Sequence, residues 1–135
     1  NVCSTCHTEE FAREWLGYAD EMAEYTLNRM REAKGMLEEL KKDGLIRPTM
    51  EVTNAHPIAG QLSAVESYFF QVNMATNRAR KGAYHMSSQW AGRQGWTDQS
   101  FGLMEFRSEV ERLRTDAERE KRIQELEELI EKLNK

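Results

Sequence analysis

Cysteine, proline and histidine are all scarce in this chain. Its 135 residues include two cysteines, two prolines and three histidines. Two cysteines cannot build the framework of disulfides that holds many small secreted domains together. No stretch approaches the about 18–20 consecutive apolar residues of a membrane span. The formal net charge is -4 and no basic run or basic face is present, so a nucleic-acid partner is not expected.

Helix-forming residues dominate what remains. Apolar and aromatic side chains recur at steps of three and four from about Thr8 to Lys42, which predicts one long helix. Thr8, followed by two glutamates, suits the N-terminal cap, and Gly44 suits the stop. Residues 45–60 contain Pro48 and Pro57 and are expected to form a connector.

Two further helices are expected after the connector. The second runs from about Gln61 to Trp90 and is expected to break at Gly92 and Gly95. The third begins near Asp98 or Ser100. The predicted fold is therefore all-α, with three long antiparallel helices and a coiled-coil-like C-terminal extension.

The apolar pattern of the third helix changes after Ala117. A new stripe of Ile and Leu begins at Ile123, and the step of six residues between them breaks the register. The helix therefore either continues with a stutter or ends before a short partner-binding helix. We expect two domains, residues 1–117 and a charged tail at 118–135. The tail is too short to be a stable helix alone and needs a partner.

The chemistry is concentrated at the start, where Cys3, Cys6 and His7 form the pattern Cys-x-x-Cys-His. This is the attachment signal for c-type haem. Two thiols reach the two vinyl groups of the porphyrin, and the adjacent imidazole reaches the iron along the axis normal to the ring. Cys3 and Cys6 would carry the thioether bonds, and His7 would be the proximal ligand.

Two other interpretations of these residues exist. A structural zinc site would use Cys3, Cys6, His7 and a fourth ligand, for which His56 and His85 are the remaining nitrogen donors. A redox dithiol or disulfide normally follows a strand, and none precedes Cys3. The full motif favours haem.

The second axial position of the iron decides what such a haem can do. A histidine there gives an electron-transfer haem, whereas an open position allows ligand binding. The candidates are His56, before Pro57 in the connector, and His85 on the second helix. Either could also serve a haem attached elsewhere, and a methionine is a weaker alternative. The Trp, Tyr and Met residues of the first helix suit a wall beside a haem, although an ordinary bundle core would have the same spacing.

Over about residues 1–117 the sequence resembles one family. The motif CSTCH, the segment NAHPIAG and the run KGAYHMSSQWAGRQGW followed by LMEFRSEVERL are similar to the C-terminal part of hydroxylamine-oxidoreductase-like octahaem cytochromes. Pentahaem cytochrome c nitrite reductases have a similar ending. The resemblance implies that Cys3, Cys6 and His7 hold the last haem of a multihaem oxidoreductase acting on small nitrogen compounds. It also implies that His56 and His85 are distal ligands of this or a neighbouring haem.

The resemblance carries further expectations. It implies a homo-oligomer, commonly a trimer, with other haem-bearing segments or electron-transfer proteins as partners, and a periplasmic or otherwise extracytoplasmic location. In oxidising members a tyrosine from this region crosslinks to a catalytic haem; Arg80 stands near that place, and neither Tyr84 nor Tyr68 is assigned the role. That departure favours a reductase or an electron carrier.

The segment shows no arrangement of catalytic side chains of its own, so we do not expect catalysis by it alone. It begins just before its first cysteine and without an initiator Met, so we expect a piece of a larger protein.

Overall fold

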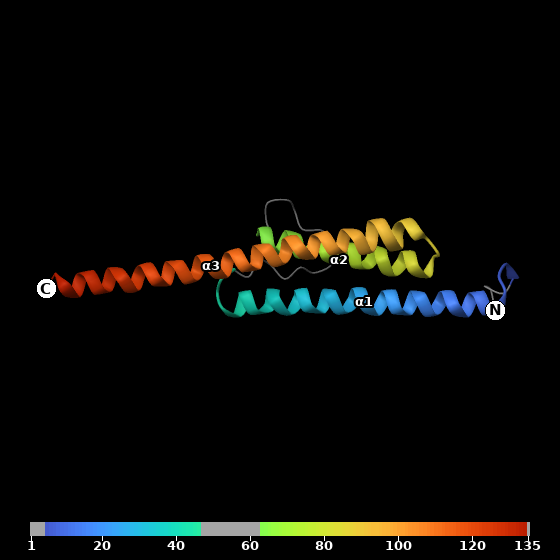
Figure 1. Ribbon diagram of the computed structural model, residues 1–135, viewed down its shortest axis with the longest axis horizontal. Coiled ribbons are helices and arrows are strands. Elements are labelled where there is room, and N and C mark those ends of the chain that lie inside the picture. Colours follow the sequence, from blue (N-terminus) through green and yellow to red (C-terminus); the bar gives the residue numbers. More distant parts are fainter. Residues whose placement is uncertain (1–4, 47–62, 135) are drawn as a thin grey trace.

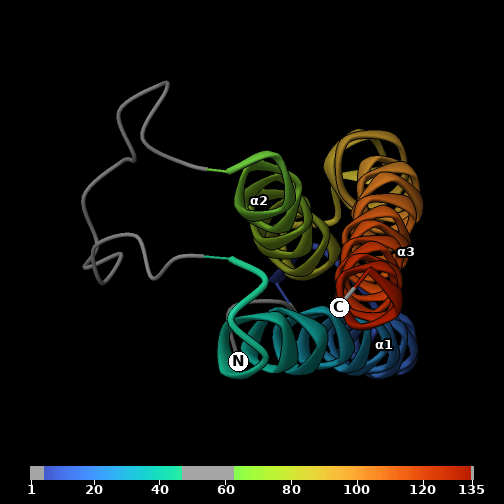
Figure 2. The ribbon, with the colours of Figure 1, turned by 90° about the vertical axis from the view of Figure 1, so that its left-hand side faces the viewer.

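The computed structural model describes residues 5–46 and 63–134, and within them every regular element is helical. The order is α1 (Glu9–Lys42), α2 (Ala64–Tyr84), the π-helix η2 (Gln89–Thr97) and α3 (Asp98–Leu133). The chain runs along α1, returns along α2 and reverses again into η2 and α3 (Figure 1). Seen end on, the three long helices form a triangle (Figure 2). The predicted all-α fold of three long helices is confirmed.

Helix α1 begins and ends where its caps predict. The Thr8 hydroxyl accepts a hydrogen bond from the Phe11 backbone N–H at 3.3 Å. Glu9 lies in the first turn and Lys42 in the last, so both charges oppose the helix dipole. Gly44 then takes a left-handed φ of 72°, which a residue without a side chain adopts freely.

Helix α2 ends earlier than the predicted boundary at Trp90. It begins with a capping box between Ser63 and Glu66, and it ends at Tyr84 with His85 as its C-terminal cap. The chain reverses through Met86, whose φ of 54° is left-handed. A methionine rarely takes this conformation, so the turn could not be predicted from the residue types alone.

The predicted helix break at Gly92 and Gly95 is wrong, because both glycines lie inside the π-helix η2. A side chain at Gly95 would overlap the backbone of Ala79, and one at Gly82 would overlap the backbone of Ala91. These two glycines therefore allow η2 and α2 to pack backbone against backbone. The third helix follows η2 without interruption.

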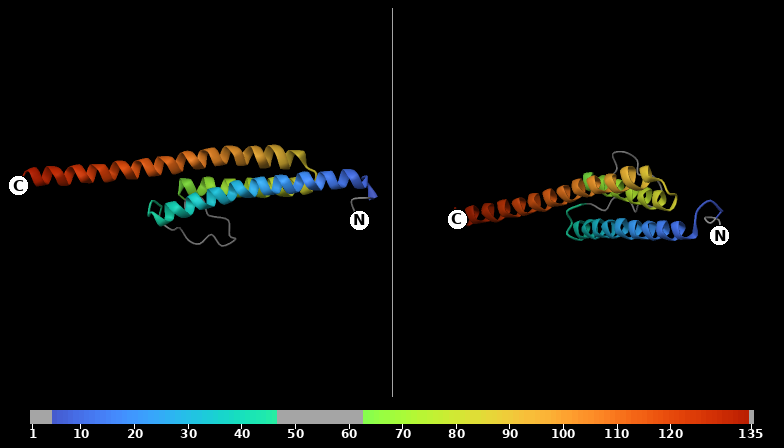
Figure 3. Two further views of the ribbon diagram at one scale, coloured as in Figure 1. Left: turned by 60° about the horizontal axis from the view of Figure 1, so that its bottom comes forward. Right: turned by 45° about the vertical axis from the view of Figure 1, so that its right-hand side comes forward.

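Helix α3 continues past Ala117 to Leu133, so the helix does not end at the change of register. Every described residue from Glu118 to Asn134 is exposed. This part of α3 extends beyond the other two helices in every view (Figures 1 and 3).

The core lies between the three helices and is richest near the end of α1. It includes Leu37, Leu40, Val72, Leu103 and Phe106, which are all buried. In the C-terminal half of α1 the large apolar residues of the predicted stripe face this core, whereas in its N-terminal half small residues face the bundle instead of aromatic ones. The buried small residues there are Ala12, Ala19, Ala23 and Thr26, whereas Phe11, Tyr18 and Tyr25 are exposed.

A buried amide connects all three helices. The Gln99 side chain is fully buried, and its Nε2 donates to the Thr26 carbonyl and to the Thr76 hydroxyl, both at 2.7 Å. Thr76 in turn donates to the Val72 carbonyl at 2.7 Å. Since a buried polar group is costly unless it is hydrogen-bonded, these bonds fix the relative position of the helices.

Candidate functional site

Cys6 and His7 precede the cap of α1 and are both exposed. Cys3 lies outside the described residues. The start of the chain lies at the same end of the molecule as the turn between α2 and η2 (Figures 1 and 3). An exposed thiol and an exposed imidazole therefore lie at this end of the molecule.

Three rings follow one another from His7 into the first turns of α1. The His7 imidazole stacks on Phe11 with a centroid distance of 4.9 Å and an interplanar angle of 30°. Phe11 stacks on Trp15 at 6.3 Å and 24°. The Trp15 indole N–H then donates to the Ala83 carbonyl at 2.8 Å. His7 is thus connected through two rings to the C-terminal turn of α2.

His85 lies at that same C-terminal turn. It is exposed and, with Arg80, Lys81 and Tyr84, lines a cavity of about 220 Å³. Within the described residues, no three side chains of the metal-binding types gather in one place, so Cys6, His7 and His85 do not form one group. The other candidate, His56, lies outside the described residues.

Tyr84 has a partner on α1. Its hydroxyl donates to the Asp20 carboxylate at 2.5 Å, and this hydrogen bond raises the pKa of Tyr84 above its ordinary value. Arg80 stands near the position where the family resemblance implies a crosslinking tyrosine in oxidising members. Arg80 is half-buried, and within the described structure its Nε atom is buried without a hydrogen-bond partner.

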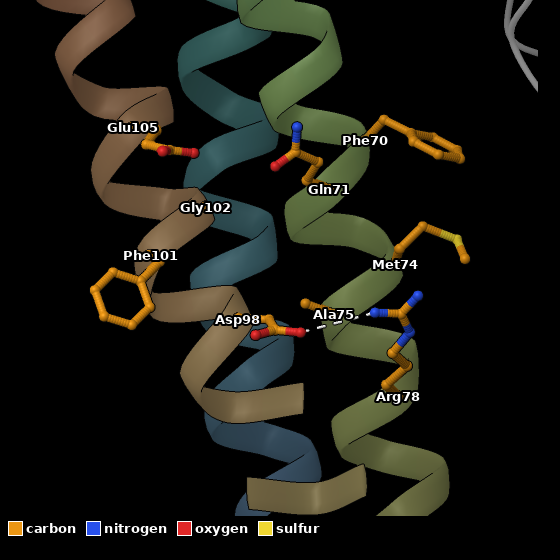
Figure 4. A pocket seen from close by; sticks show the side chains of 9 residues that line it. All are labelled: Phe70, Gln71, Met74, Ala75, Arg78, Asp98, Phe101, Gly102 and Glu105. Carbon is orange, nitrogen blue, oxygen red and sulfur yellow. Dashed lines mark ion pairs between the residues drawn. The ribbon is translucent and has the colours of Figure 1, made fainter. Parts of the chain in front are cut away.

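A second, larger cavity lies between α2 and α3 (Figure 4). Its volume is about 380 Å³, and Arg78 and Asp98 face each other across it at 3.8 Å. Phe70 and Met74 lie on its α2 side, and Phe101 on its α3 side. The lining mixes apolar rings with one ion pair and, of the histidines that the structure describes, includes neither His7 nor His85.

The residues at the N-terminal end fit a c-type haem. A thiol and a neighbouring imidazole are the donors that thioether bonds and axial iron ligation require. Cys6 and His7 are both accessible to a large planar group, and Phe11 supplies an exposed ring next to them. With the iron bound, such a group supplies one-electron chemistry.

Comparison with known proteins supports this chemistry. Residues 1–55 match the family described as "Seven times multi-haem cytochrome CxxCH". That match supports a multihaem c-type cytochrome. The cofactor of this family is haem c, bound covalently with its iron, and its members are generally extracytoplasmic. No curated protein and no solved structure matches the chain.

The sequence contains a signal for the ring stack that the sequence analysis missed. His7, Phe11 and Trp15 are each four residues apart, which aligns side chains on one face of a helix. The contact between Trp15 and Ala83 had no such signal, because it depends on how α1 packs against α2. Within the described residues, no helix has the length and apolar character needed to cross a membrane.

Proposed function

We propose that this chain is an electron-transfer module of a multihaem cytochrome, with haem c attached through Cys3 and Cys6 and with His7 as the proximal ligand. The observation that carries the proposal is the exposed Cys6–His7 pair at the cap of α1, within the segment that matches the multihaem family. A haem held here would contact the exposed ring of Phe11. Electron transfer follows from a haem iron whose ligands do not change between oxidation states.

We further propose that the iron has two histidine ligands. His85 is accessible and caps the end of α2, two residues after Ala83, whose carbonyl accepts a hydrogen bond from Trp15 of α1. Its position at a helix cap holds the backbone in one place. His56 is the alternative ligand, and either histidine could bind a haem attached to another part of the same cytochrome.

The parent protein in this proposal is an oxidoreductase acting on small nitrogen compounds, located in the periplasm. The support is the similarity of the CSTCH, NAHPIAG and KGAYHMSSQW segments to hydroxylamine-oxidoreductase-like octahaem cytochromes. Arg80, where the crosslinking tyrosine of oxidising members would stand, favours a reductase or an electron carrier. In this account the module itself passes electrons and the reaction occurs at another haem.

The visible spectrum of the purified, haem-loaded chain tests the proposal. A c-type haem is expected to give sharp bands in the reduced state. A colourless protein that contains zinc would contradict the haem module and favour a zinc site formed by the two cysteines and histidines. A colourless, metal-free helical oligomer would favour a module whose role is assembly.

A further inference from the structure

The tail of α3 carries an apolar stripe that nothing in the described structure covers. Exposed fractions along it are 54% for Ile123, 54% for Leu126, 58% for Ile130 and 85% for Leu133. The step from each residue to the next is three or four. This is the spacing of a coiled-coil seam, in which such residues are buried by a second helix.

The stripe points away from the bundle. At about 100° per residue, the direction of Ile123, Leu126 and Ile130 lies about 160° from that of Leu103, Phe106 and Val110. The latter three residues are buried against α1 and α2. The six-residue step after Ala117 produces this change of side, since a regular step of three or four would have kept the stripe on the bundle face.

Exposed side chains on the bundle part of α3 agree with this direction. Phe101 and Met104 are 60% and 61% exposed, and on the same helical wheel they fall on the side of the tail stripe. Two copies of the chain can therefore lie with their α3 helices side by side and parallel. Their bundles would then lie on the two outer sides, where they do not obstruct the contact.

The residue types select the number of strands and the direction. With Ile123 and Ile130 at the a positions and Leu126 and Leu133 at the d positions, the pattern is the one that favours two parallel strands. In this register Arg122 occupies a g position and Glu127 the next e position. In a parallel pair these two positions face each other across the seam, so Arg122 of each copy meets Glu127 of the other. Opposite charges therefore favour the parallel register.

We propose that residues 118–134 of α3 form a two-stranded parallel coiled coil with a second copy of this chain. The helix is already formed through the tail, because its first half is packed in the bundle, so pairing does not have to nucleate it. The tail thus serves as a dimerisation element. This proposal does not depend on how the haem is held.

Charge exchange in the haem-loaded full chain tests the pairing. The wild type is expected to have the mass of two copies in sedimentation equilibrium, and Arg122→Glu is expected to shift the equilibrium toward the monomer. The double variant Arg122→Glu/Glu127→Arg is expected to restore the dimer, because it exchanges the two charges. Lys121→Glu is the matched control, since it makes the same change of charge at an f position, which points away from the seam. It is expected to leave the dimer intact.

A second variant separates pairing from folding. Ile130→Asp places a charge in the seam and is expected to give a monomer with the helical signal of the bundle intact. A wild-type chain that is monomeric, or trimeric, would overturn the two-stranded coiled coil. So would a dimer that persists when residues 118–135 are removed, or a double variant that remains as monomeric as Arg122→Glu.

Discussion

At the scale of single residues, the ring next to the proximal histidine is the feature with the clearest consequence. Phe11 stacks on the His7 imidazole, and Trp15 in turn stacks on Phe11. The orientation of an axial imidazole affects the electronic state of a haem iron, and the protein sets it through the groups around the ligand. We therefore expect Phe11→Ala to broaden or shift the electron paramagnetic resonance signal of the oxidised protein and to change its reduction potential.

Tyr18→Ala is the control for that prediction. Tyr18 is also an exposed aromatic residue of α1, but it does not belong to the ring stack that includes His7. Its removal is expected to leave both measurements unchanged. If Phe11→Ala and Tyr18→Ala behave alike, Phe11 does not orient the ligand.

The second axial ligand is also a question at the residue scale. If His85 binds the iron of the haem at Cys3 and Cys6, His85→Ala is expected to convert a low-spin spectrum to a high-spin one, because the iron loses a strong-field ligand. His56→Ala has the same expected effect if His56 is the ligand. The absorption spectrum of each oxidised variant distinguishes them. A low-spin spectrum in both variants would contradict both assignments.

At the scale of the elements, the contact between η2 and α2 depends on a missing side chain. Gly95 has the backbone of Ala79 where its Cβ would be, whereas Gly92, in the same π-helix, has nothing within 4 Å of that position. Gly95→Ala is expected to lower the free energy of unfolding by about 1–3 kcal/mol or more, because the two helices must move apart. Gly92→Ala, the matched control, is expected to be neutral or slightly stabilising, because alanine favours helix. Thermal unfolding of the two variants measures the difference, and equal stabilities would contradict the close packing.

The elements also show how far the sequence could be interpreted. The bounds of α1 were predictable because caps and charged first and last turns are local signals. The end of α2 was not, since the left-handed φ of Met86 is rare for a methionine and has no local sequence signal. The sequence predicts a helix break at Gly95, but Gly95, like Gly82, allows close packing, which depends on a partner helix. On α1, aromatic and small residues both have helical spacing, and the packing of α2 selects the small ones.

At the scale of the whole molecule, two ends have two roles in this account. Cys6 and His7 are exposed just before the N-terminal end of α1, and the exposed tail of α3 lies at the opposite end of the molecule (Figure 1). We propose that residues 1–117 are the haem-bearing domain and residues 118–135 the assembly element. Separation of the two would allow copies to associate without covering the haem. The CSTCH motif predicted the first role, and the change of register after Ala117 predicted the second.

The mass of the intact chain tests the central claim most directly. The polypeptide alone is 15.8 kDa. A chain matured with haem is expected to exceed this mass by one haem group under denaturing conditions, because thioether bonds survive unfolding. Cys3→Ala/Cys6→Ala is expected to return to the polypeptide mass. A wild-type chain with the bare polypeptide mass, isolated from cells that attach haem to other c-type cytochromes, would contradict covalent haem at Cys3 and Cys6.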